Sequence, residues 1–96
     1  MDKKQLDTIL AKHLAWLGHK NGGARANLSK ADLSEADLSG SNLYAANLSK
    51  ACLRGANLSK ADLSRADLRW ANLYAANLYA ANLDGANLRG TNLRGA

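Results

Sequence analysis

The side chains that could act as nucleophiles are mostly confined to one repeated position of the chain. Six serines recur at the same place of a five-residue pattern: Ser29, Ser34, Ser39, Ser49, Ser59 and Ser64. A nucleophilic serine or cysteine needs a neighbouring base, most often a histidine, to accept its proton. The two histidines, His13 and His19, lie outside the pattern, so the sequence predicts no Ser–His or Cys–His pair.

Carboxylates and the single cysteine are the remaining groups that could support catalysis or bind a metal. The four aspartates at the second repeat position form two pairs five residues apart, Asp32 with Asp37 and Asp62 with Asp67. A metal site needs clustered ligands, whereas adjacent repeats are expected to face different directions. Cys52 replaces Asn or Asp at a repeated turn position. We therefore expect no catalytic residue, no metal site, no cofactor and no enzymatic activity.

The composition is that of one small domain built from leucine and alanine. The chain has 96 residues and a formal charge of +5, with no Phe and no Pro. No apolar run approaches the roughly 18 residues that span a membrane, and the N-terminus lacks the apolar region of a signal peptide. One cysteine cannot form an internal disulfide, so no feature indicates an oxidising compartment. The expected location is the cytoplasm.

An internal repeat of five residues explains this composition. Fourteen consecutive pentads run from Ala26 to Gly95, and Ala96 starts a fifteenth. The first position is Ala in twelve pentads, the second is Asn in nine and Asp in four, and the last two positions carry most of the charge. The third position is always leucine, which predicts a core of Leu28, Leu33, Leu38, Leu43, Leu48, Leu53, Leu58, Leu63, Leu68, Leu73, Leu78, Leu83, Leu88 and Leu93.

A period of five fits neither an α-helix nor a β-strand. On a helix, successive leucines would lie about 140° apart and would spread around the whole surface. On a strand they would alternate between the two faces, and half of them would face water. The chain must therefore turn within every pentad so that each leucine returns to a common interior. A coiled solenoid meets this requirement, with Asn and Asp in its tight turns.

The tandem A(N/D)LXX pattern resembles the pentapeptide-repeat family. The resemblance covers residues 26–96, about three quarters of the chain. It implies an all-β solenoid, a right-handed quadrilateral β-helix in which four pentads make one coil. Fourteen pentads would then form about 3.5 coils. The sequence alone does not fix the number of pentads per coil, because a period of twenty is no clearer in the variable positions than a period of five.

Residues 1–25 lack the repeat and predict an amphipathic capping helix with a Gly-rich connector, separate from the solenoid at 26–96. Asp2 and Gln5 form a capping-box pattern at the start of the helix, and Gly18 is a candidate for its end. The apolar stripe predicts packing on the first coil by Leu6, Ile9, Leu10, His13, Leu14, Trp16 and Leu17.

His13 lies within this apolar stripe, so we expect a packed, hydrogen-bonded core residue rather than a ligand or a base. The segment around it also resembles the leader that precedes many bacterial pentapeptide arrays. The residues that carry this second resemblance are His13, Trp16, Leu17, Gly23, Arg25, Ala26 and Leu28.

If the coils have four faces, cations and aromatic residues gather on two adjacent faces towards the C-terminal half. This predicts a candidate interaction face made of Lys50, Arg54, Arg69, Trp70, Tyr74, Arg89 and Arg94. Cations interleaved with aromatic rings suit phosphates and stacked bases, although rows of Lys and Arg are also ordinary solvated surface. Residues 1–25 supply three of the five positive charges, so the solenoid itself carries only +2.

The sequence therefore predicts a non-enzymatic structural or protein-interaction module with an unspecified protein partner. The unbroken leucine is typical of a designed or trimmed array. The competing class is a nucleic-acid-associated protein that binds DNA or RNA through its basic faces or, as the family resemblance implies, modulates a topoisomerase such as gyrase by mimicking DNA. The positive charge counts against mimicry, because it would repel the basic groove that accepts DNA.

No membrane partner is expected. The last coil is uncapped and ends in the pattern Leu93-Arg94-Gly95-Ala96. Because exposed edges of a coil invite pairing, the sequence also predicts a homodimer through this C-terminal coil.

Overall fold

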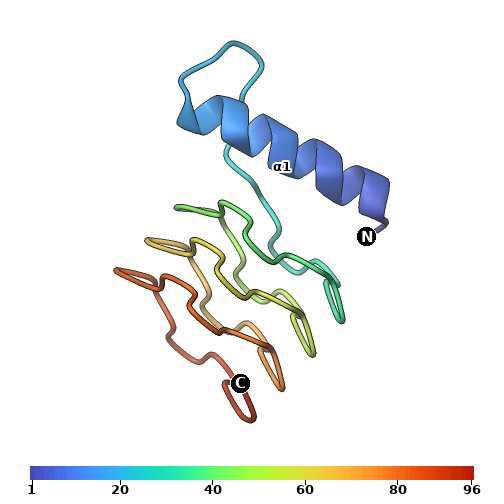
Figure 1. The fold of residues 1–96 in the computed structure, drawn as a ribbon, viewed down its shortest axis with the longest axis vertical. Coiled ribbons are helices and arrows are strands. Elements are labelled where there is room, and N and C mark those ends of the chain that lie inside the picture. The colour runs from blue at the N-terminus through green and yellow to red at the C-terminus, as the bar shows by residue number, and fades with distance from the viewer.

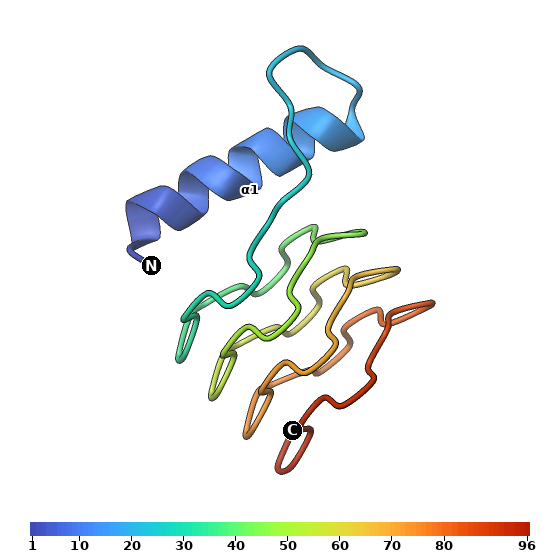
Figure 2. The same cartoon turned by 180° about the vertical axis from the view of Figure 1, so that it is seen from behind.

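The computed structural model describes residues 1–96 and contains one helix and one solenoid. The helix, α1 (Lys3–Leu17), lies across one end of the solenoid, and the last coil lies at the other end (Figures 1 and 2). The molecule measures 39 × 28 × 21 Å, and its longest dimension runs from α1 to the last coil (Figure 1).

Each coil of the solenoid contains four pentads. Ten parallel β-bridges join second-position residues that are 20 residues apart, from Asn27–Asn47 to Asn72–Asn92. No bridge extends into a continuous strand, because each pentad contributes a single bridge residue, then its leucine, then a two-residue turn. The prediction of a solenoid with an N-terminal helix is confirmed. The prediction of an all-β fold holds only in part, since there is no sheet.

The coils have four faces, called A, B, C and D, which begin with the pentads at residues 26, 31, 36 and 41 and continue every 20 residues. The backbone joins stacked pentads by a repeated set of hydrogen bonds. On face A, the Leu48 N–H donates to the Asp67 carbonyl (2.8 Å), and the Asp67 N–H donates to the Ala46 carbonyl (2.9 Å). The Lys50 N–H donates to the Arg69 carbonyl at 2.9 Å. Consecutive coils are therefore joined by backbone as well as by leucine packing.

A tight turn closes every pentad. The first-position N–H donates to the preceding leucine carbonyl, as Ala51 does to Leu48 at 3.1 Å. The fifth position has a positive φ in all fourteen pentads, between 57° and 71°, and only five of these residues are glycine. A residue with a Cβ is disfavoured there by about 1–2 kcal/mol. The inter-coil hydrogen bond that the N–H of Lys50 makes in this conformation offsets that cost.

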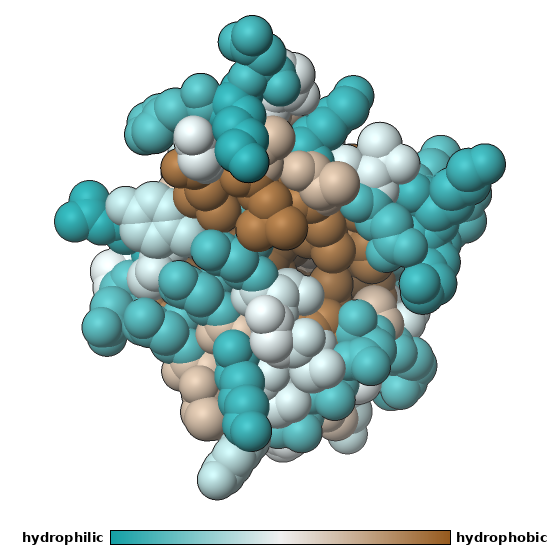
Figure 3. All heavy atoms as spheres, turned by 45° about the horizontal axis from the view of Figure 1, so that its top comes forward, coloured by the Kyte–Doolittle hydropathy of each residue, from teal (hydrophilic) through white to brown (hydrophobic).

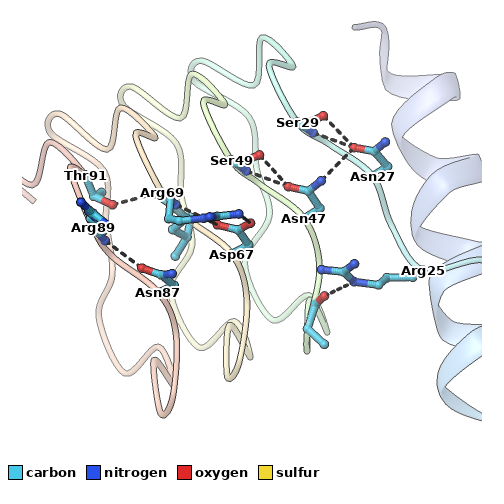
Figure 4. A network of polar contacts seen from close by, with 12 residues as sticks. Arg25, Asn27, Ser29, Asn47, Ser49, Asp67, Arg69, Asn87, Arg89 and Thr91 are labelled. Atoms are coloured by element: carbon cyan, nitrogen blue, oxygen red, sulfur yellow. Dashed lines mark hydrogen bonds and ion pairs between the residues drawn. The ribbon is translucent and has the colours of Figure 1, made fainter.

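Second-position side chains brace the same turns. In thirteen of the fourteen pentads the Oδ1 of Asn or Asp accepts the backbone N–H two residues later, at 2.9–3.1 Å. Figure 4 shows Asn27, Asn47, Asp67 and Asn87 in a row along face A. The six repeated serines donate their hydroxyl groups to the same oxygen atoms. These serine hydroxyls are thus part of the turns.

Replacing Cys52 with asparagine is expected to stabilise the solenoid. Cys52 is the only second-position residue without a side-chain oxygen, and the Arg54 N–H has no acceptor within the protein. Asn would supply that acceptor, and one such hydrogen bond contributes about 1 kcal/mol. This corresponds to a rise in Tm of roughly 4–8 °C, measured by thermal unfolding. Cys52→Ala offers no acceptor and is the control; a Tm for C52N no higher than that of C52A would contradict the argument.

The core is a column of leucines that is closed in the inner coils and open at the last one. Every third-position leucine from Leu28 to Leu73 is buried, with at most 3% of its surface exposed. Leu78, Leu83 and Leu88 are half-buried. Leu93 is 41% exposed, so the prediction that it belongs to the core is wrong. The physical reason is that the coil containing Leu93 has a neighbour on one side only.

The start of α1 has the predicted capping box. The Gln5 N–H donates to Asp2 Oδ1 at 2.8 Å, and the Asp2 N–H donates to Gln5 Oε1 at 3.2 Å. After α1, the left-handed conformation falls on His19 (φ 56°) rather than on Gly18 (φ −88°). Gly18 is nevertheless the C-cap of the helix, and its N–H donates to the Leu14 carbonyl.

Only one side of α1 packs on the first coil. Leu6 is buried, Ile9 and Leu10 contact the core, and Leu17 is half-buried. Leu14 is 56% exposed, so the prediction that it packs on the coil is wrong. Trp16 is 36% exposed and instead stacks on the His13 ring, with 5.4 Å between ring centroids and 25° between planes. Both positions lie at the margin of the apolar stripe, where a helix turns towards solvent.

His13 joins α1 to the first coil. It is completely buried, and its Nδ1 accepts the Ala26 N–H at 2.9 Å. Its Nε2 makes no hydrogen bond, although the Tyr44 carbonyl lies near the imidazole. The connector passes so close to the helix that a Cβ on Gly23 would overlap the Trp16 backbone. The helix, the connector and the start of face A therefore meet at this histidine.

Candidate interaction face

The seven residues of the predicted interaction face lie on two adjacent faces, and all are exposed. Face A carries Lys50, Arg69, Trp70 and Arg89, and face B carries Arg54, Tyr74 and Arg94. All seven occupy the turn positions of their pentads, outside the leucine column. We call this set of seven residues the basic–aromatic surface.

Trp70 contacts the next coil although it is 60% exposed. Its indole lies over Gly90 in the next coil, where a Cβ would overlap the ring atoms Cε3 and Cζ3. Gly90 also has a φ of +71°, a conformation that glycine adopts without strain. The glycine therefore leaves room for the indole to lie against the backbone of the next coil.

Arg54 and Tyr74 form the second ordered contact of the surface. The Arg54 guanidinium lies 4.9 Å from the centroid of the Tyr74 ring, one coil further along face B. A cation over an aromatic ring at an exposed site contributes about 0.5–1 kcal/mol. The pair thus orients the arginine without neutralising its charge.

Arg69 is the one cation of this surface that is paired with a carboxylate. Its Nε donates to Asp67 Oδ1 at 2.9 Å and its Nη2 donates to Asp67 Oδ2 at 2.7 Å (Figure 4). These hydrogen bonds lower the pKa of the Asp67 carboxyl and raise the pKa of the Arg69 guanidinium. The other four cations, Lys50, Arg54, Arg89 and Arg94, form no ion pair. The surface therefore has a positive excess of four charges.

A family model decides what this repeat is. The model described as Pentapeptide repeats matches residues 24–59 and 61–96, in eight copies. The chain belongs to the pentapeptide repeat family. The resemblance predicted from the A(N/D)LXX pattern is thus confirmed, and the parallel bridges every 20 residues are the backbone form of that repeat.

Solved structures of pentapeptide repeat proteins are similar to this chain. HetL, involved in heterocyst differentiation regulation in the cyanobacterium Nostoc, is 39% identical over 69% of this chain and 35% of its own, with a TM-score of 0.43. A protein of the Arabidopsis thaliana thylakoid lumen is 39% identical over 72% of this chain and 55% of its own, with a TM-score of 0.37. Rfr23 of the cyanobacterium Cyanothece is 38% identical over 76% of this chain and 60% of its own, with a TM-score of 0.41.

This pentapeptide repeat chain thus spans between about a third and three fifths of the length of these three proteins. None of the curated proteins matches it.

Two residues that shape the basic–aromatic surface escaped the sequence prediction. Asp67 neutralises Arg69, and Gly90 supports Trp70. The sequence signal that could have revealed the contact between Trp70 and Gly90 is a bulky fifth-position residue with a glycine 20 positions later. The same signal is found at Glu35, whose carboxylate lies over Gly55. It can be read in a pentapeptide repeat only when the number of pentads per coil is known.

The other chemistry-bearing residues are dispersed over the fold. His13 is buried under α1, His19 is exposed in the connector, and Cys52 is half-buried on face B. No three His, Cys, Asp or Glu side chains come together as a metal site would require. α1 is too short and too polar to cross a bilayer.

Proposed function

We propose that this pentapeptide repeat protein is a non-enzymatic structural or protein-interaction module that contacts its partner through the basic–aromatic surface. The observation that carries the proposal is Trp70, a large ring that is 60% exposed and seated on Gly90. Trp and Arg contribute most strongly to binding at protein interfaces. A ring that already packs against its own protein has less conformational entropy to lose when a partner buries it.

The charge of the surface indicates the chemistry of the partner. The four unpaired cations surround two aromatic side chains, Trp70 and Tyr74. Complementary potentials speed association and suppress wrong partners, so the partner surface is expected to be acidic, with an apolar site that receives the indole. A cytoplasmic location stays a prediction.

Nucleic-acid binding is the second candidate, and the same surface favours it in a different way. Its cations could contact phosphates, and Trp70 could stack on an unpaired base. Action on a topoisomerase by DNA mimicry is disfavoured by the formal charge of +5, because a mimic of DNA must present negative charge.

Replacing Trp70 with alanine is expected to abolish partner capture without unfolding the protein. Alanine already occupies this repeat position, with positive φ, at Ala45, Ala75 and Ala80. The measurement is affinity capture from a lysate of the source organism, quantified by mass spectrometry. The matched control is Tyr79→Ala, which removes a ring that is 72% exposed on face C. A partner retained by Y79A and lost with W70A supports the proposal, and equal capture by both variants contradicts it.

Fluorescence anisotropy with single-stranded and duplex DNA distinguishes the two candidates. We expect weak binding to both. Micromolar affinity that falls steeply with salt and is lost in W70A would replace the protein partner with a nucleic acid. Inhibition of gyrase supercoiling at a similar concentration would overturn the argument from charge.

We also propose that the protein pairs with a second copy of itself through the last coil. Leu93 is 41% exposed, and eight backbone N–H groups of this coil lack an acceptor, those of Leu78, Ala80, Leu83, Gly85, Leu88, Gly90, Leu93 and Gly95. The carbonyls through which an inner coil accepts hydrogen bonds from the next coil number only four here, those of Ala76, Ala81, Ala86 and Thr91, so the free donors outnumber these acceptors two to one in a symmetric pair. The exposed leucine side chains, rather than backbone pairing, would therefore have to hold such a homodimer together.

A further inference from the structure

An apolar groove of about 400 Å³ lies between the N-terminal half of α1 and the rim of the first coil. Its polar residues include Asp32 and Asp37, and its apolar lining is formed by Met1, Leu6, Leu10, Leu33 and Ala36. Figure 3 shows apolar side chains gathered in a recess that hydrophilic residues border. The groove is on the B and C side of the first coil, and Arg54 of the basic–aromatic surface lies one coil below its edge on face B.

The deeper coils show what normally covers this rim. On face B, the Leu33 N–H donates to the Cys52 carbonyl (2.7 Å) and the Glu35 N–H donates to the Arg54 carbonyl (2.8 Å). The Cys52 N–H in turn donates to the Ala31 carbonyl at 2.9 Å. Each pentad of an inner coil thus offers two carbonyls and one N–H to the pentad that precedes it by 20 residues.

In the first coil the same three groups of face B are unpaired. The carbonyls of Asp32 and Ser34 accept no hydrogen bond from the protein, and the Asp32 N–H donates none. The corresponding groups of faces A and C are unpaired as well, because a helix bonds its own backbone groups and offers none to the coil below it. Face B is the one whose Asp32, Leu33 and Ser34 line the groove. An unpaired edge beside an apolar groove is the setting in which proteins add an extended strand from a partner.

We propose that this groove binds an extended, Lys- or Arg-bearing segment of a partner protein, which lies parallel to residues 31–35 and completes the missing side of a coil. The register follows from the stack. The carbonyl of the segment's first residue accepts the Asp32 N–H, the N–H of its third residue donates to the Asp32 carbonyl, and the N–H of its fifth residue donates to the Ser34 carbonyl. The third side chain, leucine in every pentad of this chain, enters the groove.

The carboxylates of the rim supply the preference for a cationic segment. Second-position side chains stack along a face, so the second residue of the segment lies over Asp32. Asp7 is already paired with Lys3 at 3.2 Å, and the α-amino group lies near Asp32, whereas Asp37 has no cationic partner. Hydrogen bonds from Ser34 and Ser39 lower the pKa values of Asp32 and Asp37, so both carboxylates stay ionised at neutral pH. A whole coil of a second copy does not fit, because α1 covers the rest of this end (Figure 1).

The test uses the full chain and two acetylated, amidated peptides, Ala-Lys-Leu-Lys-Lys and Ala-Glu-Leu-Glu-Glu. Amide NMR spectra are recorded during titration, together with hydrogen exchange. We expect the cationic peptide alone to shift the signals of residues 31–37 and to slow exchange of the Asp32 N–H. Shifts elsewhere only, or equal shifts with the acidic peptide, would overturn the proposal.

The Asp32→Asn, Asp37→Asn double variant tests the charges without disturbing the fold. Asn occupies this repeat position in nine pentads and braces the same turn, so stability should be unchanged. Loss of two exposed ion pairs is expected to weaken binding of the cationic peptide about three- to thirtyfold at low salt. Asp84→Asn, an exposed change in the last coil, is the matched control and should bind as the unmodified chain does. Equal affinity of the double variant and the control would contradict the proposed contacts.

Discussion

Replacing Leu63 with lysine is expected to unfold the solenoid. Leu63 is fully buried in the column of leucines on face D, with Leu43 and Leu83 stacked on either side of it. An unpaired charge placed there is destabilising by several kcal/mol, against a total stability of about 5–15 kcal/mol for a typical domain. Because each coil is held by its neighbours, loss of a middle coil removes support from both sides. Circular dichroism during heating should show no cooperative transition.

Two lysine substitutions control for the charge itself. Leu93→Lys changes the same repeat position where the leucine is 41% exposed, and it is expected to lower Tm by only a few degrees. Ser59→Lys removes the hydroxyl that donates to Asn57 Oδ1 at 2.7 Å, but it leaves the backbone turn intact. Arginine already occupies this position at Arg69 and Arg89. A cooperative transition in L63K like that of L93K would mean that the leucine column does not hold the fold together.

The leucine core could be predicted because one residue type never changes while its neighbours do. The period of five excludes every regular element and leaves only a chain that turns in each repeat. Because Asn and Asp recur at the second position of a repeat that must turn, the sequence predicts that they lie in the turns. The thirteen hydrogen bonds from backbone N–H groups to their side-chain oxygens agree with that prediction. A single sequence predicts best those features that follow from the same local chemistry in many repeats.

The number of pentads per coil could not be predicted, because no residue type is needed to set it. The coil closes through the positive φ of the fifth position, which Lys50, Trp70 and Ala75 adopt as the five glycines do. Ala80 keeps this conformation (φ 58°) although its N–H has no next coil to bond. The fifth position therefore varies freely and shows no clear period of twenty. Trp70 and Gly90 are 20 residues apart, so their contact could not be predicted without knowing the number of pentads per coil.

The ends of the solenoid are where sequence patterns misled. Leu93 has the same sequence context as Leu63, but burial depends on a neighbouring coil rather than on the pentad. Leu14 belongs to the apolar stripe of α1, but the helix meets the coil along a narrower strip that centres on Leu6 and His13. Periodicity identifies the side of an element that can be buried. The extent of the partner surface decides how much of that side is covered.

Acidification is expected to release α1 from the first coil, because His13 is buried in its neutral form. The pKa of His13 is lowered, chiefly by burial and also by the positive charge of Arg25, while the nearby Tyr44 carbonyl acts in the opposite direction. Nδ1 accepts the Ala26 N–H at 2.9 Å, and a protonated Nδ1 could not accept it. Trp16 stacks on the imidazole, and Arg25 is the charged residue that acts on it.

The sign of the pH dependence follows from proton binding. The unfolded chain takes up a proton on this histidine near pH 6.5, and the folded chain does so only at a lower pH. Between those two values the unfolded state binds more protons, so the free energy of unfolding rises with pH. Stability is therefore complete above about pH 6.5 and declines as the pH falls towards the folded pKa, by at most about 1.4 kcal/mol per pH unit. The lowered pKa values of Asp32, Asp37 and Asp67 act only at more acidic pH.

Two histidine variants assign this pH dependence to α1. His13→Gln keeps an oxygen that can accept the Ala26 N–H but does not titrate, so its free energy of unfolding should vary little between pH 5 and pH 7.5. His19→Gln removes the exposed histidine and should retain the full decline. Helix content, followed by circular dichroism at 222 nm, should fall with pH in H19Q and not in H13Q, because a free helix of 15 residues is marginal in water. An equal decline in both variants would assign the acid sensitivity to carboxylates of the solenoid. A decline in H19Q alone would make His13 the residue through which pH controls access to the first coil.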